Sequence, residues 1–338
     1  MVWTSLHANI HRTIRSRGLL QRNQRLLIAV SGGQDSLCLT QLMLDLQPKW
    51  GWQLAIAHCD HCWRDDSQAN ANYVEQLAGE WGIPFYLETA SQSLKSEAAA
   101  REWRYQVLQQ IALSNNYQCI LTGHTATDRA ETLVYNLMRG SGADGLQALT
   151  WQRPLNDEIM LVRPLLEVTR SQTGQFCQDF QLQVWEDSTN QDLKYARNRI
   201  RQELIPYLQE KFNPKVESNL ARTAELLQAE VEYLEQAAGE LREKAEVIDI
   251  DYVENSLTLL RLNRQVLQKA PLALQRRAIR QVLQKIMLIA PSFEHIEKIV
   301  GLIKAPNRSQ TDPFPGGTVA FVSGEYICLQ KKKMKDKG

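Results

Sequence analysis

A strand, a glycine turn and a helix follow one another near the start of the sequence, and this arrangement constrains the fold more than any other feature. Residues 27–30 form an apolar run typical of a short buried strand. Gly32 and Gly33 interrupt the run, and apolar residues recur behind them at helical spacing. Glycines let a backbone approach a ligand, and free N–H groups at a helix start bind anions. The stretch therefore predicts a phosphate-binding turn, with a simple capped turn as the alternative.

The side chains of this turn narrow the kind of phosphate site. No Gly-Lys-Ser/Thr follows, so it is not a Walker loop, and the dinucleotide fingerprint Gly-x-Gly-x-x-Gly is absent. Residues 31–36 read Ser-Gly-Gly-Gln-Asp-Ser and resemble the pyrophosphate-binding loop of the N-type ATP pyrophosphatases. Members of that superfamily adenylate a carbonyl oxygen with ATP and release pyrophosphate. The resemblance implies ATP binding through Ser31, Gly32, Gly33, Gln34, Asp35 and Ser36, with Mg²⁺ held by the carboxylate of Asp35.

Strands and helices alternate through the first half of the chain. Apolar runs at residues 54–57 and 120–121 are separated by helical patterns at residues 74–81 and 97–114. Strands that alternate with helices of ten or more residues are typical of parallel sheets with helices on both faces. The sequence therefore predicts an α/β fold with a doubly wound, mostly parallel sheet, followed by a mainly α-helical second domain.

Two more motifs come directly after predicted strands, at the edge where such sheets bind ligands. His58 opens the segment His-Cys-Asp-His-Cys, and Gly123 opens Gly-His-Thr-Ala-Thr-Asp-Arg-Ala-Glu-Thr. Cys59 and Cys62 are candidate ligands of zinc or an iron–sulfur cluster, but no second Cys-x-x-Cys completes a closed site. We therefore expect His58 beside a phosphate or ribose, and the role of the two cysteines stays open.

Paired charges mark two predicted helices. Asp128 and Glu131 lie three residues apart and therefore share a helical face. The alternative interpretation is structural, because acids in the first turn of a helix are stabilised by the helix dipole. Arg101 and Arg104 have the same spacing, which suits either a guanidinium pair for phosphates or a solvated helix surface.

These motifs, taken in order, point to one family. Residues 123–132, 139–146, 163–166 and 187–201 match the pattern of the tRNA(Ile)-lysidine synthetases, and the resemblance covers roughly residues 25–210. It implies that ATP adenylates the C2 oxygen of the wobble cytidine in the CAU anticodon of tRNA(Ile). L-lysine then displaces AMP through its side-chain amine, which gives lysidine.

The demands of this reaction can be met by residues of the motifs. The catalytic candidates are Asp35, Arg101, His124, Asp128 and Glu131. We also expect His58, Arg104 and Gly123 to contact ATP. Asp128 and Glu131 are candidates for binding the lysine ammonium, and a second magnesium ion is the alternative. Arg197, Arg199 and Arg201 are expected to grip the RNA backbone near the end of this domain.

The second half of the chain has a different pattern. Apolar residues repeat in a 4-3 rhythm over residues 220–241, which predicts a long helix that is either a strut or the seam of a homodimer. A later helix carries Arg276, Arg277 and Arg280, expected to be exposed and to bind tRNA, and a hairpin is expected around Gly316-Gly317. The predicted parts are a catalytic domain at 1–210, a connecting helix at 211–245, a tRNA-binding domain at 246–330 and a basic tail at 331–338.

Composition limits the class of protein and its partners. The 338 residues carry a net charge of +1, so any RNA contact must use local basic patches. No apolar run reaches the length of a membrane span, and no signal-peptide pattern opens the chain. Six cysteines without regular spacing favour a reduced cytoplasm. The remaining alternatives are a tRNA 2-thiocytidine synthase with a sulfur nucleophile and a non-catalytic protein that binds ATP and RNA.

Overall fold

The computed structural model describes residues 2–63, 66–91, 96–185, 192–247, 252–253 and 256–331. Its internal contacts divide the chain into two compact units, Met1–Gln228 (unit 1) and Ala229–Gly338 (unit 2). The long helix α10 (Val216–Ala245) contributes its first turns to unit 1 and the remainder to unit 2. The sequence-based division, with a separate connecting helix at 211–245, stays a prediction.

Unit 1 is built on a six-stranded sheet with the strand order β3-β2-β1-β4-β6-β5. Neighbouring strands are parallel except β5, which pairs antiparallel with β6. The predicted doubly wound α/β fold is confirmed. The strands are β1 (Arg25–Ala29), β2 (Gln53–Asp60), β3 (Phe85–Thr89), β4 (Cys119–Thr122), β5 (Gln152–Pro154) and β6 (Met160–Val162).

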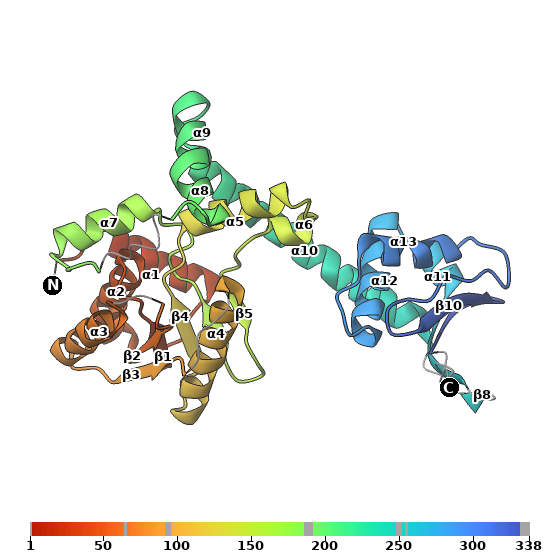
Figure 1. Cartoon of the computed structure of the whole chain (residues 1–338), viewed down its shortest axis with the longest axis horizontal. Helices are drawn as coiled ribbons and strands as arrows, with labels where there is room; N and C mark the ends of the chain where they lie inside the picture. The colour runs from red at the N-terminus through yellow and green to blue at the C-terminus, as the bar shows by residue number, and fades with distance from the viewer. Residues whose placement is uncertain are drawn as a thin grey trace. The chain divides into compact units, whose positions relative to one another are not determined.

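Helices cover both faces of this sheet. Leu26 and Ile28 of β1 pack into one apolar core, while Leu27 between them packs into another on the opposite face. Each fully buried leucine contributes roughly 1.5–3 kcal/mol, so a strand buried on both faces contributes strongly to the stability of the sheet. Figure 1 shows α1 (Ser5–Arg17), α2 (Gln34–Trp50) and α3 (Ser67–Trp81) on one side of the strands and α4 (Glu97–Ser114) on the other.

Strand order reverses at β1, and this places the functional motifs. The chain moves outward from β1 to β2 and β3, and then returns to the other side of β1 with β4. Ligands of open α/β sheets bind in the crevice at this point, outside the carboxyl ends of the strands. The segments that follow β1 and β4 are the Ser31–Ser36 turn and the Gly123 motif, so the topology brings them together.

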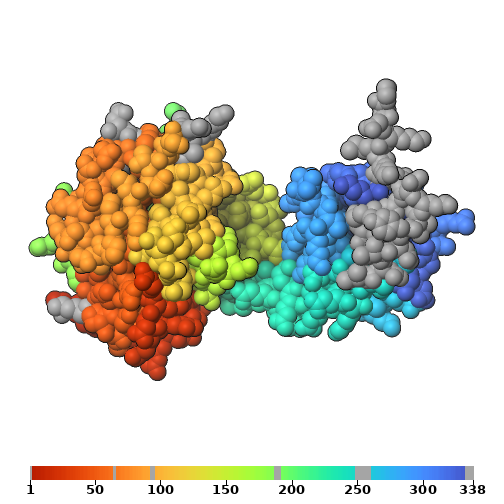
Figure 2. Space-filling view, turned by 90° about the horizontal axis from the view of Figure 1, so that it is seen from below, coloured from red at the N-terminus to blue at the C-terminus, as the bar shows by residue number. Residues whose placement is uncertain are grey.

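The remaining elements of unit 1 are mostly short and lie in its second half. In the space-filling view of Figure 2, α4 forms the yellow-orange part of the surface. The further helices are α5 (Ala126–Met138), α6 (Ala143–Leu146), α7 (Arg170–Asp179), α8 (Ala196–Arg199), the π-helical segment η2 (Ile200–Leu204) and α9 (Ile205–Lys211).

Unit 2 combines helices with a small antiparallel sheet around one apolar core. The strand order is β10-β11-β9-β7, with β8 paired to β9. Its helices after α10 are α11 (Arg264–Gln268), α12 (Leu272–Ile286) and α13 (Phe293–Leu302). Its strands are β7 (Glu246–Val247), β8 (Tyr252–Val253), β9 (Ser256–Asn263), β10 (Thr318–Ser323) and β11 (Tyr326–Lys331).

The hairpin expected around Gly316-Gly317 is present. Gly316 and Gly317 have positive φ angles of 92° and 81°, and their turn folds residues 308–314 back onto β10. Across this hairpin Phe314 N donates to Thr318 O at 2.7 Å and Thr311 N donates to Ala320 O at 2.8 Å. A second turn at Gly324 joins β10 to β11. The basic tail after Lys331 and the motif residues 187–190 lie outside the described residues.

Candidate active site

The Ser31–Ser36 turn presents backbone N–H groups at the start of α2. Gly33 is the residue before the helix and receives no side-chain cap, so the first N–H groups of α2 are left for a ligand. Ser31 N donates to Ser36 Oγ at 3.2 Å, which closes the turn. Gly32 has φ 86°, and a Cβ there would lie 2.3 Å from Asn70 Oδ1. Both observations explain why the turn needs glycine.

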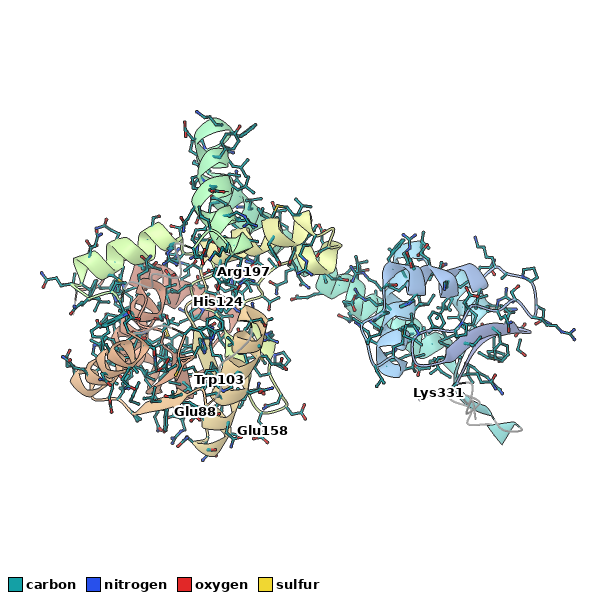
Figure 3. All side chains as sticks on the ribbon, in the orientation of Figure 1. Glu88, Trp103, His124, Glu158, Arg197 and Lys331 are labelled. Carbon is teal, nitrogen blue, oxygen red and sulfur yellow. The ribbon has the colours of Figure 1, made fainter. Side chains whose placement is uncertain are left out.

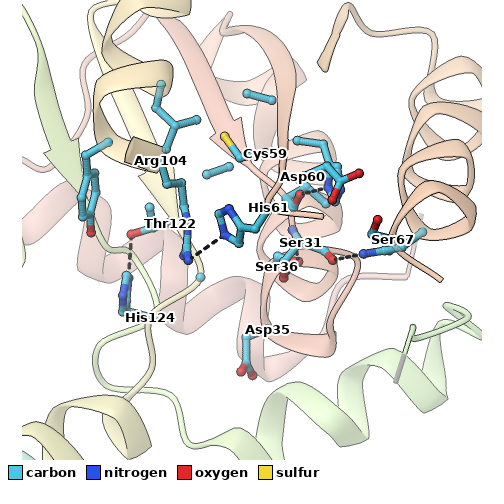
Figure 4. A pocket seen from close by; sticks show the side chains of 18 of the residues that line it. Ser31, Asp35, Ser36, Cys59, Asp60, His61, Ser67, Arg104, Thr122 and His124 are labelled. Carbon is cyan, nitrogen blue, oxygen red and sulfur yellow. Dashed lines mark hydrogen bonds between the residues drawn. The ribbon is translucent and has the colours of Figure 1, made fainter. Parts of the chain in front are cut away.

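Asp35 points from the first turn of α2 toward α7 (Figure 4). Its Oδ2 accepts from Arg170 Nη1 at 3.1 Å, and its Oδ1 accepts from Thr173 Oγ1 at 2.5 Å. Burial raises the pKa of Asp35 above its ordinary value, while Arg170 opposes that shift. One carboxylate at the cavity wall fits Mg²⁺, because this ion is usually held by one or two carboxylates plus substrate phosphates.

Arg170 and Thr173 were not found from the sequence, although Arg170 had a signal. It begins a helix, and a basic residue there opposes the helix dipole unless an acid partner is near. Gln34, expected to bind ATP, instead donates its side-chain amide to Arg170 O at 2.7 Å and to Thr173 Oγ1 at 3.0 Å. Its side chain therefore ties α2 to α7 rather than facing the cavity.

A cavity of about 360 Å³ lies between the ends of β1, β2 and β4. It is lined by seven of the residues expected at the ATP site or beside it: Ser31, Asp35, Ser36, His58, Arg104, Gly123 and His124. Gly32, Gly33 and Gln34 flank it without forming its wall. His58 is buried and its Nδ1 lies 2.7 Å from Val30 O, so it braces the turn from behind.

A second cavity of about 290 Å³ adjoins the first. It is lined by the expected residues Arg101, Arg104, His124, Asp128, Glu131, Arg197 and Arg201, together with Tyr195 and Leu149. Figure 3 labels His124 and Arg197, which come from the loop after β4 and from α8. Five residues belong to both linings: His61, Trp63, Arg104, His124 and Asp128. The two cavities therefore meet at His124 and Asp128.

Two histidines stand where the cavities meet. Arg104 Nη2 donates to His61 Nε2 at 3.2 Å, and His124 Nδ1 lies 2.9 Å from Thr122 Oγ1 (Figure 4). Burial and the Arg104 guanidinium lower the pKa of His61 to about 4. Burial also holds the pKa of His124 far below its ordinary value, although Asp128 opposes the shift. Both rings are therefore neutral near pH 7.

The acid pair on α5 is occupied by a guanidinium. Arg201 donates to both oxygens of Glu131, at 2.5 and 2.9 Å, and to Asp128 Oδ1 at 3.2 Å. Asp128 also caps α5, because Thr125 N and Oγ1 both donate to its Oδ2 at 2.8 Å. Burial raises the pKa of Glu131 while Arg201 opposes it. Burial would also raise the pKa of Asp128, but His124, Thr125 and Arg201 hold it below its ordinary value.

The other basic residues differ in how they are placed. Arg197 Nη1 lies 3.8 Å from Glu97 Oε1 at the rim of the second cavity. Arg199 donates to the backbone carbonyls of Leu193 and Lys194, at 2.8 and 3.2 Å, and does not line either cavity. The structure therefore places Arg197 and Arg201 in the lining of the second cavity, whereas Arg199 braces its own loop.

The expectation that the arginines of α12 are exposed is wrong for two of them. Arg277 and Arg280 are half-buried and both donate to Glu235 of α10, and Arg276 donates to Glu297 of α13 at 2.7 and 3.0 Å. Helical spacing alone could not show this, because Glu235 lies more than 40 residues away along the chain.

Metal-binding clusters, membrane-spanning helices and disulfides are all missing from the described residues. Within the described part of the chain, no group of three or more His, Cys, Asp or Glu side chains is arranged to hold a metal ion. No described helix combines the length and apolar character that a membrane span requires. All six cysteines are free, and burial raises the pKa of the Cys59 thiol to about 12.

Comparisons with known proteins agree with the geometry. Residues 4–208 match the family described as a PP-loop domain, and residues 262–324 match the TilS substrate binding domain. A tRNA(Ile)-lysidine synthase of Nostoc sp. is 70% identical over 98% of both chains. One of Synechocystis sp. is 50% identical over 97% of this chain and 98% of its own. A chloroplastic one of Zygnema circumcarinatum is 36% identical over 86% of this chain and 77% of its own.

Among solved structures, the U34-tRNA thiolase NcsA of Methanococcus maripaludis, which holds a [4Fe-4S] cluster, aligns with a TM-score of 0.57. It covers 66% of this chain and 78% of its own at 13% sequence identity, which shows a shared fold alone. The full-length matches and the two paired domain matches are far more specific. The chain therefore belongs to the tRNA(Ile)-lysidine synthase family of ATP-using tRNA-modifying enzymes.

Proposed function

We propose that the two adjoining cavities divide the reaction of this tRNA(Ile)-lysidine synthase between them. The first binds ATP and the second binds lysine, and the wobble cytidine of the CAU anticodon enters where they meet. The observation that carries the proposal is the shared wall formed by His61, Trp63, Arg104, His124 and Asp128. A base held there has the ATP phosphates on one side and an acid pair on the other.

Adenylation would use the residues of the first cavity. The N–H groups at the start of α2 and the hydroxyls of Ser31 and Ser36 hold the phosphates. Arg104, in the wall shared by the two cavities, and Arg101, in the adjoining second cavity, supply positive charge opposite the departing pyrophosphate. Asp35 would hold Mg²⁺ together with phosphate oxygens, and the ion would add charge neutralisation there.

His124 has a role that follows from its neutral state. With Nδ1 accepting from Thr122 Oγ1, the proton of the neutral imidazole lies on Nε2, which can then donate to a phosphate oxygen. A neutral donor at the α-phosphate orients the group without holding pyrophosphate back by charge.

Lysine attack would use the second cavity. The free amino acid carries an ammonium with a reference pKa of about 10.4, so the site must bind the cation and then take its proton. Glu131 is buried and Asp128 half-buried on one face of α5, and the two acids suit both tasks. A second magnesium ion remains the alternative occupant of this pair.

The cytidine must leave its anticodon stack to be modified, and single-stranded bases are usually held on aromatic faces. Trp63 lines both cavities with a 40% exposed side chain, and its ring lies 5.7 Å from that of His61. We propose that the base stacks there and that Arg197 contacts the RNA backbone at the rim. Arg199 and Arg201 would contribute only after leaving their present partners.

The second domain is proposed to bind the body of tRNA(Ile). The match of residues 262–324 to the TilS substrate binding domain supports this assignment. The heptad positions Ala224, Val231 and Ala238 of α10 are buried within the chain itself, which favours the strut over a homodimer seam. We also propose that the chain divides into parts at 1–210, 211–245 and 246–330. A cytoplasmic location is proposed as well.

The rival thiolation chemistry has less support. It needs a reactive thiolate or a bound cluster, but Cys59 has a raised pKa and is therefore a protonated thiol at neutral pH. The decisive experiment is incubation of the enzyme with bulk tRNA, ATP and labelled lysine. We expect ATP-dependent incorporation of lysine into tRNA, with pyrophosphate and AMP released. No incorporation in the presence of active ATP hydrolysis would overturn the proposal.

A single substitution tests the assignment of the first cavity. Asp35→Ala should abolish pyrophosphate release and leave tRNA binding within about twofold, because Asp35 touches α7 and the cavity but no RNA-facing segment. Glu102→Gln, on the exposed side of α4, is the matched control for loss of one acid. Pyrophosphate release at the wild-type rate by Asp35→Ala would remove this residue from the mechanism.

A further inference from the structure

Every carboxylate oxygen of the proposed lysine site already has a donor. Arg201 donates hydrogen bonds to three of the four: Glu131 Oε1 at 2.5 Å, Glu131 Oε2 at 2.9 Å and Asp128 Oδ1 at 3.2 Å. Thr125 N and Oγ1 donate to the fourth, Asp128 Oδ2. A substrate ammonium must therefore share these oxygens with a guanidinium or replace it.

Sharing is hindered by the geometry of the acid pair and not by its charge. The two acids and Arg201 carry a net charge of −1, so the site still attracts a cation. Arg201 covers both oxygens of Glu131, whose side chain is only 3% exposed, and this leaves an ammonium little access to them. Lysine can therefore bind Glu131 with useful affinity only after Arg201 withdraws.

The segment that carries Arg201 is suited to movement. Arg201 lies in the π-helical stretch Ile200–Leu204, a geometry that is rare and gathers at functional sites. One turn earlier, Tyr195 and Arg197 line the second cavity, with Tyr195 42% exposed. The ion pair of Arg197 with Glu97 spans 3.8 Å at the surface, so a phosphate group can displace it at little cost.

We propose that Arg201 is a tethered stand-in for the lysine ammonium, which closes the lysine site in the free enzyme and withdraws when RNA engages residues 195–199. Lysine would then bind after the tRNA, and a free amine would be kept from ATP until the cytidine is in place. The inference rests on the proposed function, since it takes Asp128 and Glu131 as the ammonium site.

The first test uses the wild-type protein. L-lysine is titrated by calorimetry into the free enzyme and into its complex with tRNA(Ile) and a non-hydrolysable ATP analogue. If the competent state is a minor population, the apparent Kd of the free enzyme is raised by the inverse of that fraction. We expect binding at least about tenfold tighter in the complex. Equal affinities in the two states would overturn the proposal.

Substitutions of Arg201 give the second test. Free Arg201→Ala should bind lysine nearly as tightly as the wild-type complex does, whereas Arg201→Lys, which keeps a tethered cation, should stay as weak as free wild type. Because Arg201→Ala leaves the buried Glu131 and the half-buried Asp128 without this cation, its melting temperature should fall and be raised again by lysine. Lysine binding by Arg201→Ala that is weaker than that of wild type in both states would show that Arg201 assists binding, and the proposal would be wrong.

A third variant separates this inference from the proposed function. Glu131→Gln should weaken lysine binding to the complex. If it does not, the acid pair is not the ammonium site and the proposed function fails. If it does, but free wild type binds lysine as tightly as the complex, only the role of Arg201 fails.

Discussion

His61 illustrates how one neighbour and burial determine the state of a side chain that faces both cavities. Its Nε2 accepts from Arg104, and a guanidinium cannot accept in return, so the ring proton must reside on Nδ1. Burial and Arg104 together lower its pKa to about 4. The residue is therefore neutral at physiological pH and carries a buried Nδ1–H without a hydrogen-bond partner among the described residues, which its position in a Cys-His motif did not indicate.

This state is testable by titration. In Arg104→Gln the pKa of His61 should rise, because the second-largest cause of its depression is removed, yet burial should keep it below 6.5. NMR of the imidazole between pH 3.5 and 8 measures both values. Since the folded pKa is the lower one, the contribution of His61 to stability is present above pH 6.5 and is lost as the pH falls toward 4. An unchanged pKa in Arg104→Gln would show that burial alone sets it.

The acid pair on α5 gives the second prediction at this scale. Asp128→Asn or Glu131→Gln removes a charged partner worth about 1.5–3 kcal/mol, so KM for lysine should rise roughly 10- to 100-fold. KM for ATP should rise much less, and initial rates with each substrate varied give both constants. Glu131→Gln is the cleaner variant, because Asp128 also caps α5. A rise in KM for ATP that equals or exceeds that for lysine would assign the pair to magnesium instead.

Among the elements, those fixed by local pattern were predicted well. The helix expected at residues 97–114 is α4 (Glu97–Ser114). Strand β2 was predicted only at residues 54–57 but extends to Asp60, because it pairs with β3 as far as Thr89. Such pairing is a long-range property, so a local apolar run cannot show where a strand ends.

The junction of β4 and α2 gives a prediction at the scale of elements. A Cβ on Gly123 would lie 2.8 Å from the backbone C and O of Asp35 and 2.9 Å from Ser36 N, so Gly123→Ala must push the two segments apart. We expect ATP affinity to fall by about tenfold or more, since overpacking typically costs about 1–3 kcal/mol. Nucleotide binding measured by calorimetry or fluorescence tests this.

Gly79→Ala is the matched control for this variant. Gly79 lies within α3 and a Cβ there meets nothing within 4 Å, so the substitution should leave ATP affinity unchanged and raise helix stability slightly. Equal ATP affinity in Gly123→Ala and wild type would show that the turn is not held by its contact with β4.

The parts of the site that escaped prediction share one physical reason. Arg170 pairs with Asp35 across 135 positions and Arg201 with Glu131 across 70, so neither pair leaves a local pattern. The motifs pointed to acids that line the cavities, because acids just after strands are visible in a sequence. They did not show which cations pair with those acids, because these partners come from distant parts of the chain.

At the scale of the whole molecule, the arginines of unit 2 offer less positive charge to RNA than the sequence suggests, because acids already bind them. Arg276, Arg277 and Arg280 were expected to offer three free cations to phosphates, but Glu235 and Glu297 already bind them. Three positive charges paired with two negative ones leave a net charge of +1 for the group. The arginines can contact RNA fully only by exchanging these partners, so their contribution to affinity should be most visible in its salt dependence.

A truncated chain tests whether unit 2 provides the RNA contacts. A cut near Pro214 would remove Glu217, which accepts from Thr127, and Glu225, which binds Arg129 at 2.5 Å and Trp151 at 2.7 Å. The better variant ends at Glu232, one helical turn beyond unit 1. It should keep ATP binding, and its melting curve and solubility are checked first, because the cut exposes an apolar face of α10.

The slope of log tRNA affinity against log salt concentration then tests whether unit 2 provides the RNA contacts. Each phosphate contact contributes about 0.7–0.9 to the log-log slope. If all three arginines of α12 exchange their acids for phosphates, the truncated chain should lose roughly two to three units of slope. If Glu235 and Glu297 keep their partners, the loss should be roughly one unit or less, as the net charge of +1 implies. A slope unchanged between the full chain and the truncated one, measured by filter binding, would place the RNA contacts in the α/β domain and refute the proposed role of the second domain.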